Sequence, residues 1–505
     1  MNHTTRARRL PIDLSVWGAC VVSLGAGGFA VAQTAPGEGV KQPPQKTDAS
    51  ALTIAIDPAR QFQRIEGFGT CLFPWGEDNR RAYNTPGFDK IYAEELGLNI
   101  VRINLEHFLC KEFEKPEDIT REGILINDMC RVYTDMCKKV KALNPDVRIL
   151  ATVWSPPAWM KVNNKMDSGA PRGQNAAILA SSYTLTKNRG VCDNRVREDR
   201  YPHFVAWMTA VADWFKHEGI PLYAMSPANE PRFSQYYGSC VWTAKDFATI
   251  IALLGEGLEK AGHGDILLYG PEDMTGHLHN EGTSRYVQAL MEDPRASKQL
   301  DRFATHGYTD GVQADVSQDS SHQFWTLIEK YNKPYWMTEG GTGEHAWPKP
   351  VTEGAGIAIH NSLVAGNASA FVPWQITGGK ATGHNFMLMD KMTPKTRTLL
   401  HFARAVPTDG RRISAEPAFG PVLASAYHRA QDGRLGIVLI NPTKQDCEVT
   451  LSLGKFARVE NLRLYRTTNG ESVDDAGETP VRAGEAKVAM PAESIASLRG
   501  VATLQ

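Results

Sequence analysis

The stretch that decides the fold reads LYAMSPANEP and spans residues 222–231. Its first residues form a short apolar run, and prolines on both sides of Glu230 then bend the chain. A second stretch, PYWMTEGG at 334–341, repeats this design, because an apolar run ends at Glu339 and two glycines follow. Both stretches therefore predict a buried β-strand with a glutamate at its carboxyl end.

Similar short apolar runs recur along the chain on both sides of these two stretches. Helical periodicity lies between them, as in Phe204, Trp207, Met208, Val211 and Phe215. The predicted strands cover 65–70, 99–104, 148–154, 222–226, 266–270, 302–308, 335–339 and 370–375. Eight strands alternating with helices predict an α/β fold, a (β/α)8 TIM barrel.

A doubly wound sheet is the competing α/β fold, and it usually has fewer strands and a glycine-rich phosphate turn. The cluster that resembles such a turn is Gly25-Ala26-Gly27-Gly28, which lies in the predicted export signal described below. We therefore expect the catalytic barrel to span residues 61–410.

The pattern changes after Arg412, where short strand candidates follow one another and helical periodicity is weak. The candidates are 422–429, 434–440, 448–453, 461–467 and 487–490. This pattern predicts a C-terminal antiparallel β-sandwich over 411–505, and residues 51–60 are expected to supply a strand that joins it.

The amino-terminal segment has the features of an export signal. Three arginines near its start precede an apolar run over 16–31, and Ala30-Val31-Ala32 fits the small-residue cleavage rule. A transmembrane anchor is the alternative, but the run is short and rich in glycine. We predict a secretory signal peptide over 1–32, a flexible leader over 33–50, and a secreted or periplasmic protein.

Composition narrows the range of partners. The formal net charge is −1, so electrostatics give no reason to expect nucleic acid, and no second apolar run is long enough to span a bilayer.

Seven cysteines follow the signal, an odd number; Cys192 and Cys240 are expected in loops on one face and form our candidate disulfide. The sequence leaves the other pairings and the oligomeric state open.

The two glutamates suggest a reaction. TIM barrels carry their chemistry at the carboxyl ends of the strands, where Glu230 would end the fourth strand and Glu339 the seventh. Hydrolysis of a glycosidic bond needs one carboxyl group as proton donor and a second as nucleophile or base. A structural ion pair would explain either glutamate alone, but two at such bends favour a glycosidase acting on a carbohydrate substrate.

Several motifs together resemble glycoside hydrolase family 30, whose members are retaining barrel enzymes that include glucosylceramidases. The motifs are IEGFG at 65–69, WSPPAWM at 154–160, SPANEP at 226–231, TEG at 338–340 and FARAVP at 402–407. The resemblance implies Glu230 as general acid/base, Glu339 as nucleophile and no cofactor. It also implies β-1,6-glucan, β-1,6-galactan, xylan or a glucosylceramide-type compound as substrate, and the sequence does not choose among them.

Five further residues are expected to bind substrate or support the carboxylates. Asn229 can bond a sugar hydroxyl, although a local turn bond is the simpler role. Tyr308 and Arg102 each end a strand and can orient Glu339, or serve the core instead. Aromatic rings stack on the apolar faces of sugars, and we favour Trp154 and Trp374 as such platforms.

Two other functions remain as alternatives. A metal-dependent barrel hydrolase would use His277, His279 and His306 as ligands, but no bridging carboxylate cluster accompanies them in the sequence. The main prediction therefore includes no metal. A carbohydrate-binding relative without turnover is the second alternative, and it would keep its affinity for glycan after Glu339→Gln.

Overall fold

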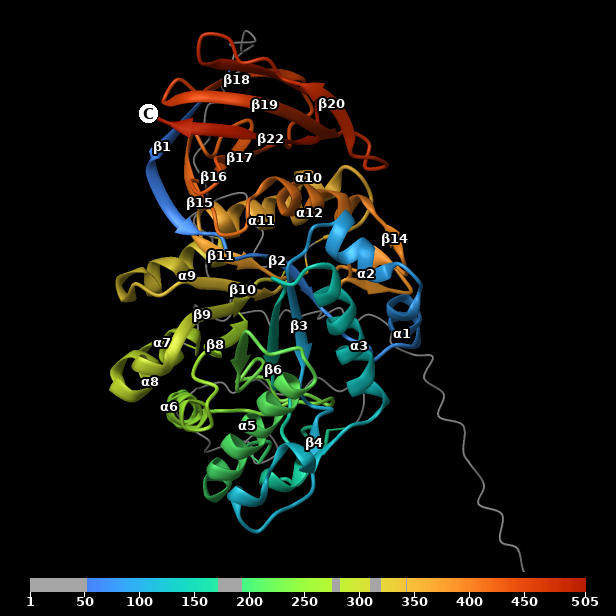
Figure 1. Ribbon diagram of the computed structural model, residues 1–505, viewed down its shortest axis with the longest axis vertical. Helices are drawn as coiled ribbons and strands as arrows, with labels where there is room; N and C mark the ends of the chain where they lie inside the picture. Colours follow the sequence, from blue (N-terminus) through green and yellow to red (C-terminus); the bar gives the residue numbers. More distant parts are fainter. Residues whose placement is uncertain (1–51, 171–192, 275–281, 309–318, 342) are drawn as a thin grey trace, which may run out of the picture. The chain divides into compact units, whose positions relative to one another are not determined.

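The computed structural model describes residues 52–170, 193–274, 282–308, 319–341 and 343–505 (Figure 1). The predicted signal and leader lie outside these ranges, as do Cys192, His277 and His279. Cys240, the expected partner of Cys192, is buried, and the proposed disulfide stays a prediction because Cys192 lies outside the described residues. Among the described residues, no helix combines the length and apolar character needed to cross a bilayer.

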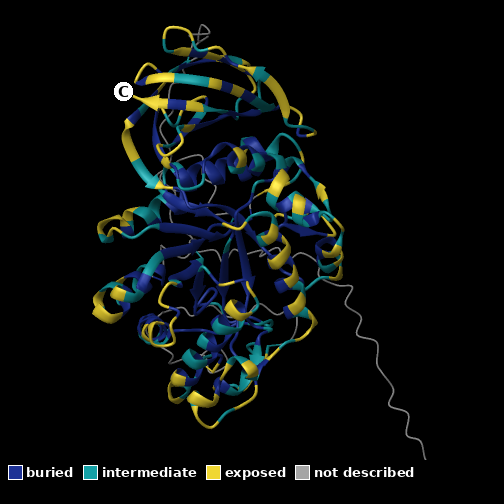
Figure 2. Cartoon of the chain, viewed as in Figure 1, coloured by how far each residue is buried: buried dark blue, intermediate teal, exposed yellow. Residues whose placement is uncertain are grey.

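Eight parallel strands close into a barrel, which confirms the predicted fold class. In barrel order they are β2 (Gly67–Cys71), β3 (Ile100–Asn104), β6 (Arg148–Thr152), β7 (Ala224–Ser226), β8 (Leu267–Met274), β9 (Leu300–His306), β10 (Tyr335–Glu339) and β11 (Ala368–Phe371). Their residues are almost all buried (Figure 2), as expected for parallel strands covered on both faces.

Helices follow the strands and cover the barrel from outside. They are α1 (Glu77–Asn84), α2 (Phe88–Lys90), α3 (Asp128–Leu143), α5 (Tyr201–His217), α6 (Ala244–Lys260), α7 (Gly282–Glu292), α8 (Pro294–Gln299), α9 (Ser320–Ile328), α10 (Lys349–Thr352), α11 (Ala355–Val364) and α12 (Pro394–Ala405). Side-chain caps begin several of them; Thr243, for example, accepts a hydrogen bond from the Asp246 amide at the start of α6.

The barrel interior is a packed core. Its side chains are Cys71, Phe73, Ile100, Leu150, Trp154, Ala224, Tyr269, Ala304, Trp336, Ala370 and Val372. Side chains from successive strands fill the space in layers, as in other TIM barrels, so the barrel is not a pore. Short strands in the connecting loops are β4 (Leu109–Cys110), β5 (Ile124–Leu125), β12 (Thr377–Gly378), β13 (Met387–Leu388) and β14 (Lys391–Met392).

The second domain is the β-sandwich, built from nine strands. In hydrogen-bonded order they are β20 (Asp474–Glu478), β19 (Phe456–Thr467), β22 (Ser494–Leu504), β17 (Arg434–Asn441), β16 (Leu423–Arg429), β15 (Arg411–Glu416), β1 (Leu52–Arg64), β18 (Cys447–Ser452) and β21 (Glu485–Met490). Strand β1 pairs antiparallel with β15 and parallel with β18, so the first described strand completes a domain formed by the end of the chain.

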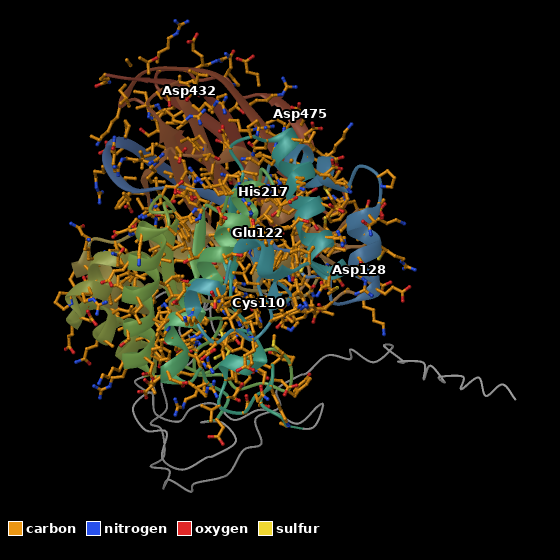
Figure 3. The ribbon with its side chains drawn as sticks, turned by 60° about the horizontal axis from the view of Figure 1, so that its bottom comes forward. Cys110, Glu122, Asp128, His217, Asp432 and Asp475 are labelled. Atoms are coloured by element: carbon orange, nitrogen blue, oxygen red, sulfur yellow. The ribbon has the colours of Figure 1, made fainter. Side chains whose placement is uncertain are left out.

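Helix α12 joins the two domains, with α11 beside it (Figure 1). His401 of α12 is fully buried, and its two ring nitrogens lie 2.9 Å from Ser497 Oγ and 3.0 Å from Thr467 Oγ1. The outer surface of the sandwich instead carries ion pairs such as Arg463–Asp475 at 2.6 Å (Figure 3). Exposed pairs of this kind contribute little stability, whereas the buried contacts of His401 link α12 to strands of the sandwich.

Candidate active site

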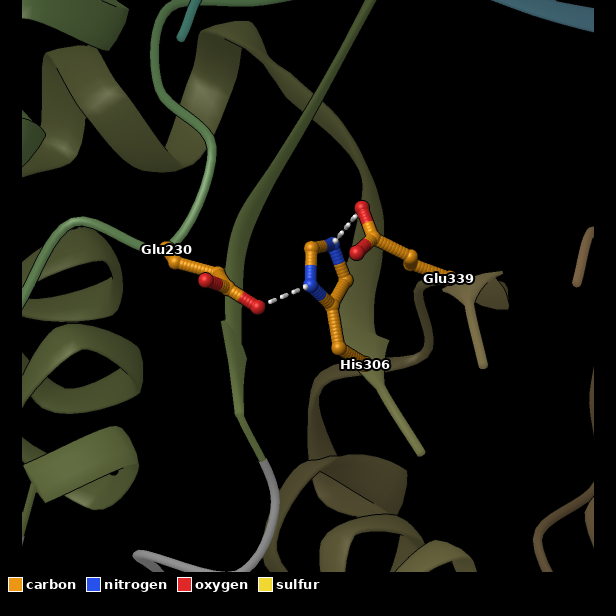
Figure 4. A group of neighbouring side chains, drawn as sticks. All are labelled: Glu230, His306 and Glu339. Carbon is orange, nitrogen blue, oxygen red and sulfur yellow. Dashed lines mark hydrogen bonds and ion pairs between the residues drawn. The ribbon is translucent and has the colours of Figure 1, made fainter. Parts of the chain in front are cut away.

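Two glutamates approach each other at the carboxyl end of the barrel. Glu339 is the last residue of β10, and Glu230 lies four residues beyond β7, in the following loop rather than at the strand end itself. One carboxylate oxygen from each, together with a ring nitrogen of His306, all lie within 4.8 Å of one another (Figure 4). Both glutamates are buried, so the two carboxylates share one small site.

The backbone places Glu230 by an unusual conformation. Its φ is +46°, in the left-handed region that side chains other than glycine rarely adopt. The Glu230 amide donates to the Glu272 carbonyl at 3.1 Å, and its own carbonyl accepts from the Phe233 amide at 2.8 Å. Such strain costs about 1–3 kcal/mol and persists only where neighbouring contacts hold it, as they do here.

Arg102 of β3 connects most of the charged groups in the site. It is fully buried; Nη1 donates to Glu339 Oε2 at 2.8 Å, and Nη2 donates to Asn229 Oδ1 at 2.9 Å. The same Nη2 lies 3.0 Å from Glu272 Oε1. A guanidinium group stays charged even when buried and offers several donors in a fixed plane, so it orients three side chains at once.

Tyr308 completes the surroundings of Glu339. Its hydroxyl donates a short hydrogen bond to Glu339 Oε1, the oxygen that Arg102 does not contact. Burial, reinforced by the negative charge of Glu339, raises the pKa of Tyr308 well above its usual value. The phenol therefore remains a proton donor, and both oxygens of Glu339 are held in place.

His306, at the end of β9, lies between the acids. Nδ1 is 3.1 Å from Glu230 Oε1, and Nε2 is 3.7 Å from both Glu272 Oε1 and Glu339 Oε2. Burial alone would lower the pKa of His306, but the three carboxylates outweigh it and raise that pKa to about 9. The imidazole is therefore charged at neutral pH, and both of its ring nitrogens carry a proton.

The pKa values of Glu230 and Glu272 are shifted in opposite directions. Burial, with the charge of Glu339, raises the pKa of Glu230 although His306 opposes the shift. Burial would also raise the pKa of Glu272, but Arg102 and His306 outweigh it and hold that pKa below its usual value. A carboxyl group with a raised pKa beside ionised ones is the arrangement a proton donor needs.

Aromatic rings form one wall of the site. Phe73 is buried at their centre, with its ring centroid 4.0 Å from that of Trp374, 4.8 Å from Trp75 and 4.9 Å from Trp154. Trp154 is buried and packs against the Arg102 guanidinium, 4.7 Å from its ring centroid. Trp75 and Trp374 are only half-buried, so part of each indole remains exposed at this wall.

The alternative with a metal ion can be examined at the same place. Glu230, His306 and Glu339 are close enough together to share one ion. A metal ligand must be a neutral imidazole, whereas His306 carries its proton on account of the surrounding carboxylates. The other proposed ligands, His277 and His279, lie outside the described residues. A metal ion at this place would therefore have to displace the His306 proton.

Sequence reasoning missed two members of this cluster. His306 entered only as a metal ligand, and Glu272 was not selected, although it follows Gly270-Pro271 near the end of the fifth barrel strand. The available signal was positional, since both residues stand at the carboxyl end of a barrel strand. The structure also brings Asn229, Tyr308 and Arg102 into contact with the cluster.

Comparison by sequence finds distant relatives. No protein-family model matches the chain. The chain is 21% identical over 451 residues to the lysosomal acid glucosylceramidase of Mus musculus, covering 80% of each protein. It is 25% identical over 411 residues to glucuronoxylanase XynC of Bacillus subtilis, covering 79% of this chain and 80% of that protein.

Comparison by structure extends over both domains. A glycoside hydrolase family 30 subfamily 8 xylanase, Xyn30A from Clostridium acetobutylicum, superposes with a TM-score of 0.68 at 20% identity. The match covers 89% of this chain and 99% of the xylanase. At this identity the likeness establishes a shared architecture of barrel and sandwich.

Proposed function

The chain belongs to glycoside hydrolase family 30 and is a β-glycosidase, and from this premise we propose that it cleaves its substrate with retention of configuration. The observation that carries the proposal is the separation of Glu230 and Glu339, whose nearest carboxylate oxygens lie within 4.8 Å. Retaining enzymes hold their two carboxyl groups about 5–5.5 Å apart, whereas inverting enzymes leave about 6.5–9.5 Å for a water molecule.

In the first step Glu339 attacks the anomeric carbon as Glu230 donates its proton to the departing glycosidic oxygen. The bond to the leaving group breaks while an ester bond forms between the sugar and Glu339. Arg102 and Tyr308 hold the attacking carboxylate, and burial together with Glu339 keeps Glu230 protonated at the start.

In the second step Glu230, now ionised, takes a proton from water as the water oxygen attacks the anomeric carbon. The ester bond breaks and its electron pair returns to Glu339. Esterification has removed the negative charge of Glu339, which is one cause of the raised pKa of Glu230. The same residue therefore serves first as acid and then as base.

The relatives limit the class of candidate substrates but do not select one substrate within it. A glucosylceramidase and a glucuronoxylanase are both similar to this chain at comparable, low identity. We propose a β-linked glycan or glycoconjugate, with β-1,6-glucan, β-1,6-galactan, xylan and glucosylceramide-type compounds as candidates. Asn229 is proposed to bind a sugar hydroxyl, and Trp374 is proposed to stack on the sugar ring. Trp154, which is buried, is proposed to support the indole ring of Trp374.

Trapping of the covalent intermediate tests the mechanism. The protein is incubated with 2-fluoro β-glycosides of several sugars, and peptides are then analysed by mass spectrometry. We expect added mass on the peptide that carries Glu339, since fluorine at C2 slows the second step more than the first. Label on another carboxylate, or inverted product from the natural glycan, overturns the proposal.

Two cheaper assays address the alternatives. A chelator leaves the rate unchanged if the chemistry is that of the carboxylates, and abolishes it if a metal ion is required. Release of sugar from a panel of β-glycans separates an enzyme from a binding protein without turnover. Export is a further proposal, tested by locating the mature protein and sequencing its amino terminus.

A further inference from the structure

A third carboxylate lies beneath the catalytic pair. Glu272 is fully buried at the carboxyl end of β8, and its φ of +56° places it in the left-handed region. Oε1 lies 3.0 Å from Arg102 Nη2 and 3.7 Å from His306 Nε2, and Oε2 accepts from Thr152 Oγ1 at 3.0 Å. Arg102 also contacts Glu339, and His306 also lies beside both Glu230 and Glu339.

The contacts around Thr152 fix the orientation of Glu272. The Thr152 hydroxyl donates to Glu272, so it accepts from the Tyr269 hydroxyl at 2.6 Å and from Arg102 Nε at 3.2 Å. Burying a third acid beside two others is costly unless opposite charge compensates it. The described residues supply that charge through Arg102 and His306, which ties Glu272 to both catalytic carboxylates.

We propose that Glu272 is a positioning residue, which keeps His306 charged with its Nδ1 proton directed at Glu230 while Glu339 passes between carboxylate and ester. This role rests on the retaining mechanism proposed above. Glu272 need not contact the substrate, because it acts through His306 and Arg102 on the two groups that do.

The enzyme depends on Glu272 most in the second step of the reaction, while Glu339 is an ester. When Glu339 becomes an ester, His306 Nε2 loses one of its two neighbouring carboxylates, and Glu272 remains as the other. A charged His306 then favours the ionised form of Glu230, which is the form that accepts a proton from water. Without Glu272, Glu230 would be the carboxylate that the described residues leave beside His306, just when Glu230 must act as base.

Glu272→Gln tests the proposal, since it keeps size and shape but removes the charge. With an aryl β-glycoside that has a good leaving group, we expect kcat to fall about tenfold, as for a shift of one pKa unit. We expect kcat/KM, which reports the first step, to change by less than about threefold. Glycosyl-enzyme then accumulates and a burst of phenol precedes the steady state. Equal losses in kcat and kcat/KM overturn the proposal.

A second measurement does not depend on turnover. In histidine-labelled protein, with His306 assigned through His306→Gln, we expect the NMR titration midpoint of His306 to fall by about one unit in Glu272→Gln. Glu66→Gln is the matched control, since Glu66 is another buried acid but lies at the opposite end of the barrel, and it should leave that midpoint unchanged. An unchanged midpoint in Glu272→Gln overturns the role.

The unmutated protein offers a third measurement in case Glu272→Gln fails to fold. In enzyme trapped with a 2-fluoro glycoside, Glu339 has lost its charge, yet His306 should remain protonated at neutral pH because Glu272 stays beside it. A neutral His306 in the trapped enzyme overturns the proposal. Failure to label Glu339 contradicts the retaining mechanism instead, so the two failures are distinguishable.

Discussion

The two ends of the barrel use buried acids in opposite ways. At the amino end, Glu66 accepts from Arg302 Nε at 2.9 Å, from Trp336 Nε1 at 3.0 Å and from the Tyr223 hydroxyl at 2.9 Å. At the carboxyl end, Glu230, Glu272 and Glu339 share Arg102 and His306. One end gives an acid its own cation and neutral donors, and the other end has more acids than cations.

This difference is the one expected between a structural acid and the proposed catalytic acids. Glu66 is held by one cation and two neutral donors, an arrangement typical of a structural ion pair. Carboxylates that compete for the same cations have divergent proton affinities, which acid and base catalysis requires. Burial alone does not separate the two kinds, since Glu66 and Glu339 are about equally inaccessible to solvent.

Glu339→Gln is expected to have the largest effect on activity. If Glu339 is the nucleophile, we expect turnover to fall by roughly 10⁴-fold or more, because no covalent intermediate can form. Release of reducing sugar from the natural substrate measures the loss, and thermal unfolding checks that the variant is folded. A folded variant that retains a tenth of the parent activity would contradict the assignment.

Glu230→Ala should give the next largest effect. We expect substrates with poor leaving groups to lose about 10²–10⁴-fold in kcat/KM, since these need a proton on the departing oxygen. Aryl glycosides with acidic phenols should lose much less in the same assay. If both kinds of substrate suffer the same loss, the proton donor is another residue.

Glu66→Gln examines the amino end. We expect the free energy of unfolding to fall by about 3 kcal/mol, because the Arg302 charge is left without its partner. Denaturant unfolding measures this change, and kcat/KM of the folded variant should match that of the parent. A catalytic defect without loss of stability would remove the distinction between the two ends.

A smaller effect concerns the dependence of stability on pH, because the protein buries one histidine in the charged form and another in the neutral form. His306 is charged, whereas burial lowers the pKa of His401 at the domain junction to about 3. The unfolded chain takes up that proton near pH 6.5, so stability is complete above this pH and falls as the pH drops towards 3. Protonation of His401 on unfolding should therefore lower the free energy of unfolding by at most about 2 kcal/mol between pH 6.5 and 5.

We would measure the free energy of unfolding of the parent and of His401→Gln across this range of pH. The difference between the two curves gives the contribution of His401 to the pH dependence of stability. The stability of the variant should depend less steeply on pH, because glutamine does not titrate. Parallel curves for the two proteins would show that His401 takes up no proton on unfolding in this range.

Much of the architecture could be predicted from the sequence, because strands and helices leave local patterns. Several barrel strands contain a short apolar run, and the run that ends at Glu339 matches β10. The cluster around His306 could not be predicted in the same way. His306 and Glu272 belong to different strands, and nothing in either local segment states which charges surround it.

Three properties can be predicted from local sequence: the alternation of strands and helices, the change to short strands after the barrel, and the two glutamates beside proline and glycine bends. These properties depend on residues close together in the chain. The tertiary structure is needed to see which acids share Arg102 and His306, and in which direction the pKa values of Glu230 and Glu272 shift. Proton affinity depends on burial and on charges within a few ångströms, and in this protein barrel closure brings those charges together from distant strands.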